Sequence, residues 1–106
     1  ASAALTQDDF DSTVVKGVSF VLFTSPYCGH CRAFTPTWEK LVEHSLISAD
    51  VQLAQVDCSV SGALCNAQGV KGYPQMNLYR DGDFVDTYYG SRSFDLLVTY
   101  LAAAAA

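Results

Sequence analysis

The spacing of apolar residues changes along the chain, and these changes predict the order of strands and helices. Residues 18–23 (VSFVLF) are nearly all apolar, which is typical of a strand covered on both faces. Residues 51–57 return to alternating apolar and polar positions, which predicts a second strand. Between them the apolar residues recur at helical spacing from Cys28 onward, and Pro36 should kink that long helix. The apolar side of the helix comprises Phe34, Trp38, Leu41, Val42 and Leu46.

Two more helices are predicted near the ends of the chain. Thr6, followed three residues later by Asp9, is a variant capping arrangement that should open a short helix over residues 7–14. A last helix is predicted from apolar residues on one helical stripe. These residues are Phe94, Leu97, Val98 and Leu101.

The remaining segments determine the kind of sheet. A strand, a long helix and a strand in succession predict a right-handed crossover and a parallel pair. Residues 76–79 and 84–89 flank Asp81-Gly82, which is a turn sequence typical of a β-hairpin. The sequence therefore predicts an α/β domain.

Length, charge and composition exclude several classes of function. The 106 residues fit a single domain, residues 1–106, that can bury a core of its own. The net charge of −5 has the wrong sign for a nucleic-acid partner, and the apolar run at 18–23 is far too short to span a membrane. The alanine run at 102–106 could be a non-native addition, and we assign it no function. The carboxylates expected on the solvated surface are Asp8, Asp9, Asp11, Asp81, Asp83 and Asp86.

Cys28 and Cys31 occupy a position where reactive groups are expected. Cys28 lies just past the carboxyl end of a buried strand and in the first turn of the long helix. The unpaired N–H groups and partial positive charge of a helix N-terminus favour a thiolate over a thiol. The spacing lets the Cys31 sulfur reach the Cys28 sulfur while remaining less exposed. We therefore expect Cys28 to be the nucleophile and Cys31 the resolving cysteine.

Three other uses of this cysteine pair are weighed against redox cycling. Covalent haem attachment needs a histidine directly after the second cysteine, where Arg32 stands. A zinc site needs four ligands, usually as two close pairs, whereas Cys58 and Cys65 are seven residues apart and expected on the far side of a strand. An inert staple would close a very small loop and gain little stability. Redox cycling is the favoured use, and neither a metal nor an organic cofactor is expected.

Several segments together resemble an active domain of the protein disulfide isomerase family. These are SPYCGHC followed by RAFTPTWEKL, then VKGYPQMNLYRDG at residues 70–82, then YYGSR before the last helix. They occur in the family's order and cover residues 5–101. The resemblance implies the thioredoxin fold, a central mixed β-sheet flanked by helices, and a catalytic motif of Cys28, Gly29, His30 and Cys31.

The resemblance also implies roles for two charged residues and exposes two departures. His30 is expected to stabilise the Cys28 thiolate and make the disulfide more oxidising, and Arg92 to approach Cys31 and lower its pKa. Leu22 stands where the family commonly has a buried glutamate, which is thought to accept the proton of the second cysteine. Tyr27 replaces the usual tryptophan, a mild change because it keeps an amphipathic ring beside the sulfur. His44, late in the long helix, is interpreted as a surface residue or a weak cap without a role.

Substrate binding is expected around a proline that faces the motif. Pro74 stands where thioredoxin-like proteins have a cis peptide bond, and the backbone at Gly72 and Tyr73 could pair with an extended client segment. Recognition would then depend on main chain and on Tyr27 and Tyr73, which suits broad specificity.

Cys58 and Cys65 form the second pair. Two free, buried cysteines are one interpretation, since free cysteine behaves as a small apolar residue. Their spacing resembles a second cysteine pair of some isomerase-family domains, and the family's compartment is oxidising. The resemblance thus implies a structural Cys58–Cys65 disulfide.

The sequence as a whole predicts a thiol–disulfide oxidoreductase or isomerase that acts on unfolded or misoxidised proteins. The family implies the endoplasmic reticulum lumen and a larger parent chain, and we expect a monomer. Two alternatives remain open: a redox-silent, chaperone-like module that binds unfolded chains, which Leu22 favours, and a cytosolic thioredoxin-like reductase.

Overall fold

The computed structural model describes residues 3–106, apart from the side chains of residues 3, 45, 46 and 48. The predicted apolar contact of Leu46 therefore lies outside the described residues. The elements are β1 (Ala3–Leu5), α1 (Phe10–Val14), β2 (Val18–Thr24), α2 (Gly29–Glu43), α3 (Ser45–Asp50), β3 (Val51–Asp57), α4 (Gly62–Ala67), β4 (Gln75–Arg80), β5 (Asp83–Thr87) and α5 (Phe94–Ala105).

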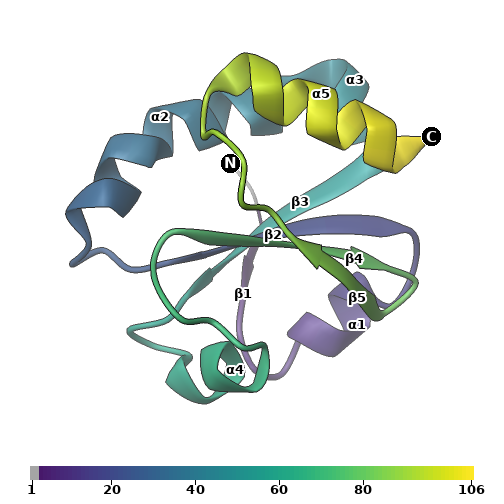
Figure 1. Cartoon of the computed structure of the whole chain (residues 1–106). Helices are drawn as coiled ribbons and strands as arrows, with labels where there is room; N and C mark the ends of the chain where they lie inside the picture. Colours follow the sequence, from purple (N-terminus) through teal and green to yellow (C-terminus); the bar gives the residue numbers. More distant parts are fainter. Residues whose placement is uncertain (1–2) are drawn as a thin grey trace.

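The five described strands form one mixed sheet in the order β1-β3-β2-β4-β5. β3 pairs in parallel with both β1 and β2, and β4 is antiparallel to β2 and β5. Helices α2, α3 and α5 cover one face of the sheet, and α1 and α4 cover the other (Figure 1). The α/β class and the mixed, helix-flanked sheet are as predicted.

Each face of the sheet has its own apolar core. The core under α2 and α5 contains Trp38 and Leu41 of α2 together with Leu97 and Leu101 of α5, all at most 1% exposed. The core under α1 and α4 contains Phe10 of α1, packed edge-on against Tyr79 of β4. β2 contributes to both cores by alternation, which explains its almost unbroken apolar sequence.

The hairpin forms where the sequence predicts it. Asp81 and Gly82 both have positive φ, 51° and 90°, which is the backbone of the tight turn that matches the strand twist. Asp81 also accepts a hydrogen bond from the Gly17 N–H through its carboxylate, at 2.8 Å. The turn is thereby tied to the loop that precedes β2.

Five local features differ from the predictions. β1 was not predicted. α1 begins at Phe10 rather than near residue 7. The Thr6 N–H nevertheless donates a hydrogen bond to Asp9 Oδ1 at 2.6 Å, as in a helix cap. The long helix ends at Glu43, because His44 has an extended backbone and α3 starts after it. The imidazole of His44 is half-buried against the Phe94 ring, 5.9 Å away, and not simply a surface group. α5 continues through residues 102–105, where the Ala104 carbonyl accepts a 2.7 Å hydrogen bond from Arg80.

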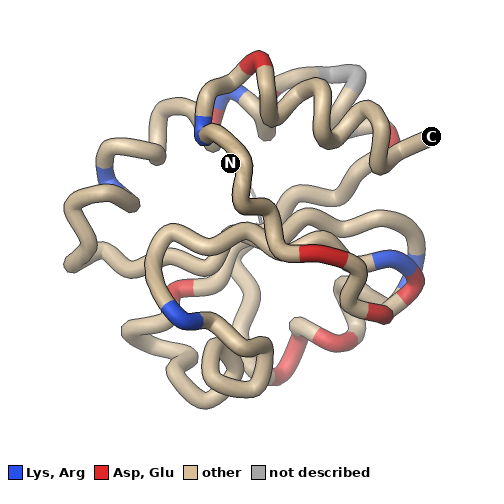
Figure 2. The backbone as a smooth tube through the Cα atoms, viewed as in Figure 1, with Lys and Arg blue, Asp and Glu red and all other residues tan. Residues whose placement is uncertain are grey.

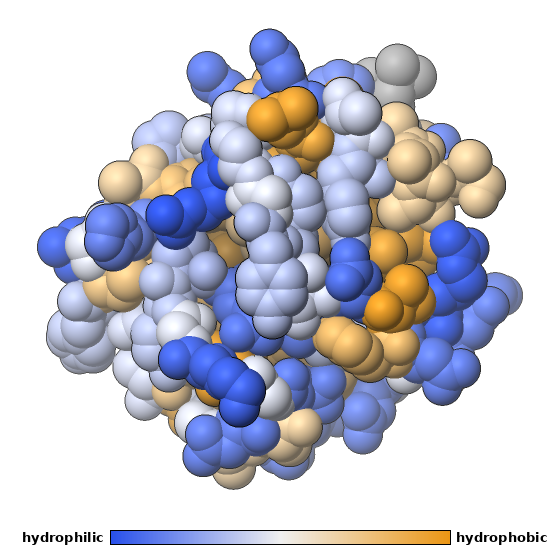
Figure 3. Space-filling model, in the orientation of Figure 1, coloured by the Kyte–Doolittle hydropathy of each residue, from blue (hydrophilic) through white to orange (hydrophobic). Residues whose placement is uncertain are grey.

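The six aspartates predicted on the surface from their positions near element ends are all exposed. Figure 2 shows many of them around α1 and the β4–β5 hairpin. Apolar side chains are exposed in small separate groups on the face shown in Figure 3. Among the described residues, no helix is both long enough and apolar enough to cross a membrane.

Candidate active site

Cys28 is held at the start of α2 by a short loop that leaves β2. It is the N-cap residue, and its sulfur accepts a hydrogen bond from the Cys31 N–H at 3.2 Å. Ser25 shapes the loop, because its carbonyl accepts from the Cys28 N–H and its hydroxyl from the Tyr27 N–H, both at 3.2 Å. The sulfur therefore takes the place of a capping oxygen on the first helical turn.

The two thiols differ in accessibility. Both are free, so the structure has the pair in its dithiol form. Cys28 is half-buried at the rim, whereas Cys31 is only 4% exposed. An incoming disulfide can therefore reach Cys28 before Cys31.

The surroundings shift the two pKa values in opposite directions. A hydrogen bond with the Cys31 side chain lowers the pKa of Cys28, and backbone N–H groups of Cys31 and His30 and the Arg32 charge lower it further, against a smaller desolvation effect. Burial raises the pKa of Cys31, and the Cys28 sulfur raises it too. The Thr24 hydroxyl and the Ser25 N–H partly offset that rise. The arrangement therefore favours ionisation of the Cys28 thiol over ionisation of the Cys31 thiol.

Arg32 is a site residue that the sequence pattern did not predict. Its Nη1 donates to the Pro26 carbonyl at 3.0 Å, which holds the guanidinium near the loop and the Cys28 sulfur. The contribution of His30 to Cys28 comes through its backbone N–H, while its side chain is exposed. Arg92 is exposed in the loop before α5 and is not among the described residues that line the pocket behind Cys31.

The proline loop lies against the motif. The peptide bond between Tyr73 and Pro74 is cis, as expected, and the Cys28 thiol lies 3.7 Å from the Tyr73 carbonyl oxygen. Tyr27 is 84% exposed and Tyr73 44% exposed, so both rings are open to a client. Gly72 is exposed beside them.

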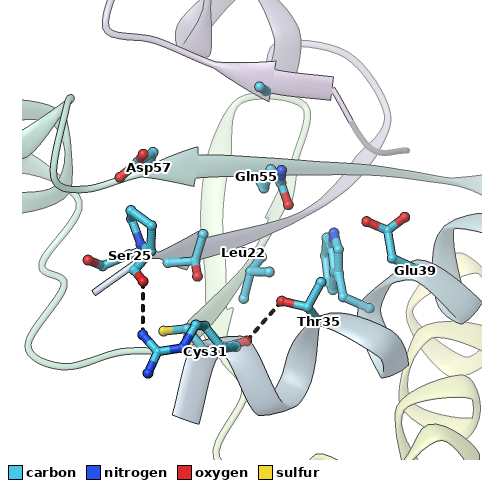
Figure 4. Close-up of a pocket in the computed structure, with 12 residues that line it drawn as sticks. Leu22, Ser25, Cys31, Thr35, Glu39, Gln55 and Asp57 are labelled. Atoms are coloured by element: carbon cyan, nitrogen blue, oxygen red, sulfur yellow. Dashed lines mark hydrogen bonds between the residues drawn. The ribbon is translucent and has the colours of Figure 1, made fainter. Parts of the chain in front are cut away.

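A pocket of about 260 Å³ lies behind Cys31, between α2 and the ends of β2 and β3. Leu22 and Thr24 of β2 line it, beside their cross-strand partners Gln55 and Asp57 of β3. Figure 4 shows the Cys31 sulfur and Ser25 toward one end of the pocket and Glu39 at the other, beyond Thr35. Leu22 lies on the pocket wall that faces Cys31, so any residue at this position would have its side chain across the pocket from the Cys31 thiol.

The second cysteine pair is separate from the motif. Cys58, directly after β3, is joined to Cys65 of α4 by a disulfide, with their Cα atoms 5.8 Å apart. Both residues belong to the core under α1 and α4, on the opposite face of the sheet from α2. Within the described part of the chain, no group of three or more acidic, histidine or cysteine side chains is arranged to hold a metal ion.

The family model named Thioredoxin matches residues 1–103 of the chain. The chain belongs to the thioredoxin family. Together with the architecture described above, this confirms the predicted thioredoxin fold.

Relatives and a solved structure also match this thioredoxin-family domain. A "Thioredoxin domain-containing protein 5 homolog" of Drosophila melanogaster is 41% identical over 98 residues, and a "Protein disulfide-isomerase" of Aspergillus oryzae is 40% identical over 100 residues. The first two thioredoxin domains of Naumovozyma dairenensis Eps1p match with a TM-score of 0.90 and 33% identity, over 96% of this chain and 40% of that one. The two relatives are matched over 90% and 92% of this chain but only 24% and 19% of their own length. The expected resemblance to single domains of larger disulfide isomerases is confirmed.

Proposed function

We propose that this domain exchanges disulfides with cysteines of other proteins through Cys28 and Cys31. The supporting observation is the asymmetry of the pair: an accessible thiol with a lowered pKa next to a buried thiol with a raised one. A thiolate is the nucleophile in disulfide exchange, and a low-pKa thiolate is also a good leaving group.

In the reducing direction, the Cys28 thiolate attacks one sulfur of a client disulfide. A bond forms between Cys28 and the client, and the second client sulfur leaves as a thiolate. Cys31 then loses its proton and attacks Cys28, which forms the Cys28–Cys31 disulfide and releases the first client sulfur. The client gains two electrons and the domain loses two. Oxidation of a client is the reverse of these steps. In isomerisation, Cys28 attacks and is later released, with no net transfer of electrons.

Client binding is proposed at the rim formed by Tyr27, Gly72, Tyr73 and Pro74. The open rings and the exposed backbone beside Cys28 provide apolar contacts and main-chain pairing that any unfolded segment can use. We propose unfolded or misoxidised proteins as clients, a monomeric domain of a larger chain, and the endoplasmic reticulum lumen as its compartment. The Cys58–Cys65 disulfide supports an oxidising compartment.

The recovery of activity from scrambled ribonuclease tests the proposal, with the Cys28→Ser variant as the control. The wild type should restore native disulfides and the variant should not; equal performance would favour a redox-silent binding module. The equilibrium potential separates the isomerase from the reductase: a value near about −180 mV supports an isomerase, and one near about −270 mV supports a thioredoxin-like reductase.

A further inference from the structure

The resolving step requires a destination for the proton of Cys31. The thiol is 4% exposed, and burial raises its pKa, so ionisation in place is unfavourable at neutral pH. Leu22, on the pocket wall that Cys31 faces, cannot take a proton. An acceptor must therefore be reached through the pocket or in bulk water.

The pocket contains two carboxylates at different distances along it from the sulfur. Glu39 lies at the far end, beyond Thr35, whose own hydroxyl donates to the Cys31 carbonyl at 3.0 Å (Figure 4). Asp57 is the cross-strand partner of Thr24 in the parallel pair of β2 and β3, about 4.8 Å away in the strand-to-strand direction. Thr24 is also the residue whose hydroxyl contacts the Cys31 sulfur. Of the two carboxylates, Asp57 is the one whose cross-strand neighbour has a hydroxyl beside the Cys31 sulfur.

The Asp57 carboxylate is held in position within this arrangement. Its Oδ1 accepts hydrogen bonds from the Ser59 N–H at 2.9 Å and the Ser59 hydroxyl at 2.7 Å. The residue is half-buried on the pocket wall, and a pocket of this size has room for water between polar groups. A fixed carboxylate that a hydroxyl group can reach through water is a competent proton acceptor.

We propose that Asp57 accepts the Cys31 proton, through the Thr24 hydroxyl and pocket water, when Cys31 resolves the mixed disulfide. The sulfur–hydrogen bond of Cys31 breaks as its proton passes to Thr24, whose own hydroxyl proton passes through water to the Asp57 carboxylate. The Cys31 thiolate forms a bond to Cys28, and the client sulfur leaves with the electron pair of the broken Cys28–client bond. This inference rests on the proposed oxidoreductase function.

Removing the negative charge of Asp57 changes the rate of the resolving step, and the direction of that change distinguishes a proton acceptor from a charge that only lies near Cys31. Removing a negative charge near Cys31 lowers the pKa of that thiol and should speed the resolving step. Removing the acceptor should instead slow it. The Asp57→Asn variant therefore gives opposite results under the two explanations, and the asparagine oxygen can keep the Ser59 hydrogen bonds.

The test is single-turnover reduction of a disulfide-bonded peptide by the full reduced chain, with acid quenching between about pH 6 and 9. Asp57→Asn should leave formation of the mixed disulfide unchanged and slow its resolution about 10-fold at neutral pH. The difference should shrink toward the upper end of this pH range, where hydroxide increasingly removes the Cys31 proton directly. Thr24→Val should show the same slowing, and Thr24→Ser, which keeps the hydroxyl, should restore the rate.

Two further variants make the outcome decisive. Glu39→Gln is the matched carboxylate control and should resolve at the wild-type rate, while Leu22→Glu added to Asp57→Asn should recover resolution by supplying a new acceptor. Thermal unfolding and an intact Cys58–Cys65 disulfide by mass spectrometry check that each variant is folded. Faster or unchanged resolution in Asp57→Asn overturns the inference, as does slowing in Glu39→Gln alone. A wild type that forms no mixed disulfide contradicts the proposed function instead.

Discussion

Removal of the Cys58–Cys65 disulfide should cost the domain a calculable part of its stability. The two cysteines are seven positions apart, so the bond closes a loop of eight residues. Chain-entropy arguments give such a loop a stabilisation of about 2.5 kcal/mol, because the unfolded chain is restricted when the bond is present. In the Cys58→Ala/Cys65→Ala variant the loss of two buried sulfur atoms adds roughly 1 kcal/mol. For a chain of 106 residues the entropic part alone corresponds to a decrease in Tm of about 11 °C.

Urea unfolding of the variant and wild type, both under mild reductant, measures this difference in the free energy of unfolding. The Cys28→Ala/Cys31→Ala variant is the control, because that pair is free and closes no loop. The control should lose the packing energy of Cys31 and the helix cap that the Cys28 sulfur provides, but no loop-closure contribution. A strong reductant that opens the Cys58–Cys65 bond should lower the free energy of unfolding of the wild type toward that of the Cys58→Ala/Cys65→Ala variant. A loss below about 1 kcal/mol, or equal losses in both double variants, would show that the disulfide does not stabilise the domain by closing the loop.

Three further predictions concern the motif and the core. Alkylation of the reduced protein should show Cys28 titrating with a midpoint below the ordinary cysteine value of about 8.5, and a midpoint at or above 8.5 would contradict the geometry. Because the pKa of Cys28 is lowered in the folded state, its thiolate stabilises the reduced domain above the unfolded pKa, and this stabilisation is lost as the pH falls through the folded pKa. Arg32→Gln should raise that midpoint, because the charge held by the Pro26 carbonyl is lost, and Lys40→Gln, on the same helix, should leave it unchanged. Trp38→Ala should reduce the free energy of unfolding by about 3–5 kcal/mol, because the side chain is 1% exposed in the core under α2 and α5; a change within 1 kcal/mol by urea unfolding would contradict the described packing.

The parts of the fold that the sequence predicted are those with a long or chemically specific pattern. β2 is recognisable because both of its faces are covered, and the turn at Asp81-Gly82 because it needs two residues with positive φ. β1 has only three residues and is stabilised by pairing with β3, so no periodicity can appear in it. The break between α2 and α3 depends on the backbone of His44, a residue whose type does not require an extended conformation.

The site divides in the same way. Cys28 and Cys31 were predictable, since their spacing and their place at a helix start are properties of the sequence. The contribution of Arg32 depends on a carbonyl six residues earlier, which comes within reach only when the loop from Ser25 is formed. The nearness of Asp57 to Thr24 depends on the register of two strands that the sequence does not specify.

The two cysteine pairs show that position in the fold decides what a pair of thiols does. Cys28 lies at the end of a strand where the chain turns into a helix, so its sulfur has N–H groups on one side and solvent on the other. Cys58 also follows the end of a strand, but its N–H is bonded to the Thr24 carbonyl at 2.8 Å and its side chain enters the core. The buried Cys58–Cys65 disulfide is out of reach of a client thiolate. Cys28, at the rim, can attack a client disulfide, and the Cys28–Cys31 disulfide can be attacked by a client thiolate. Exchange at Cys28 can therefore proceed while Cys58 and Cys65 stay joined, since a client that reaches the first pair from solvent does not touch the second.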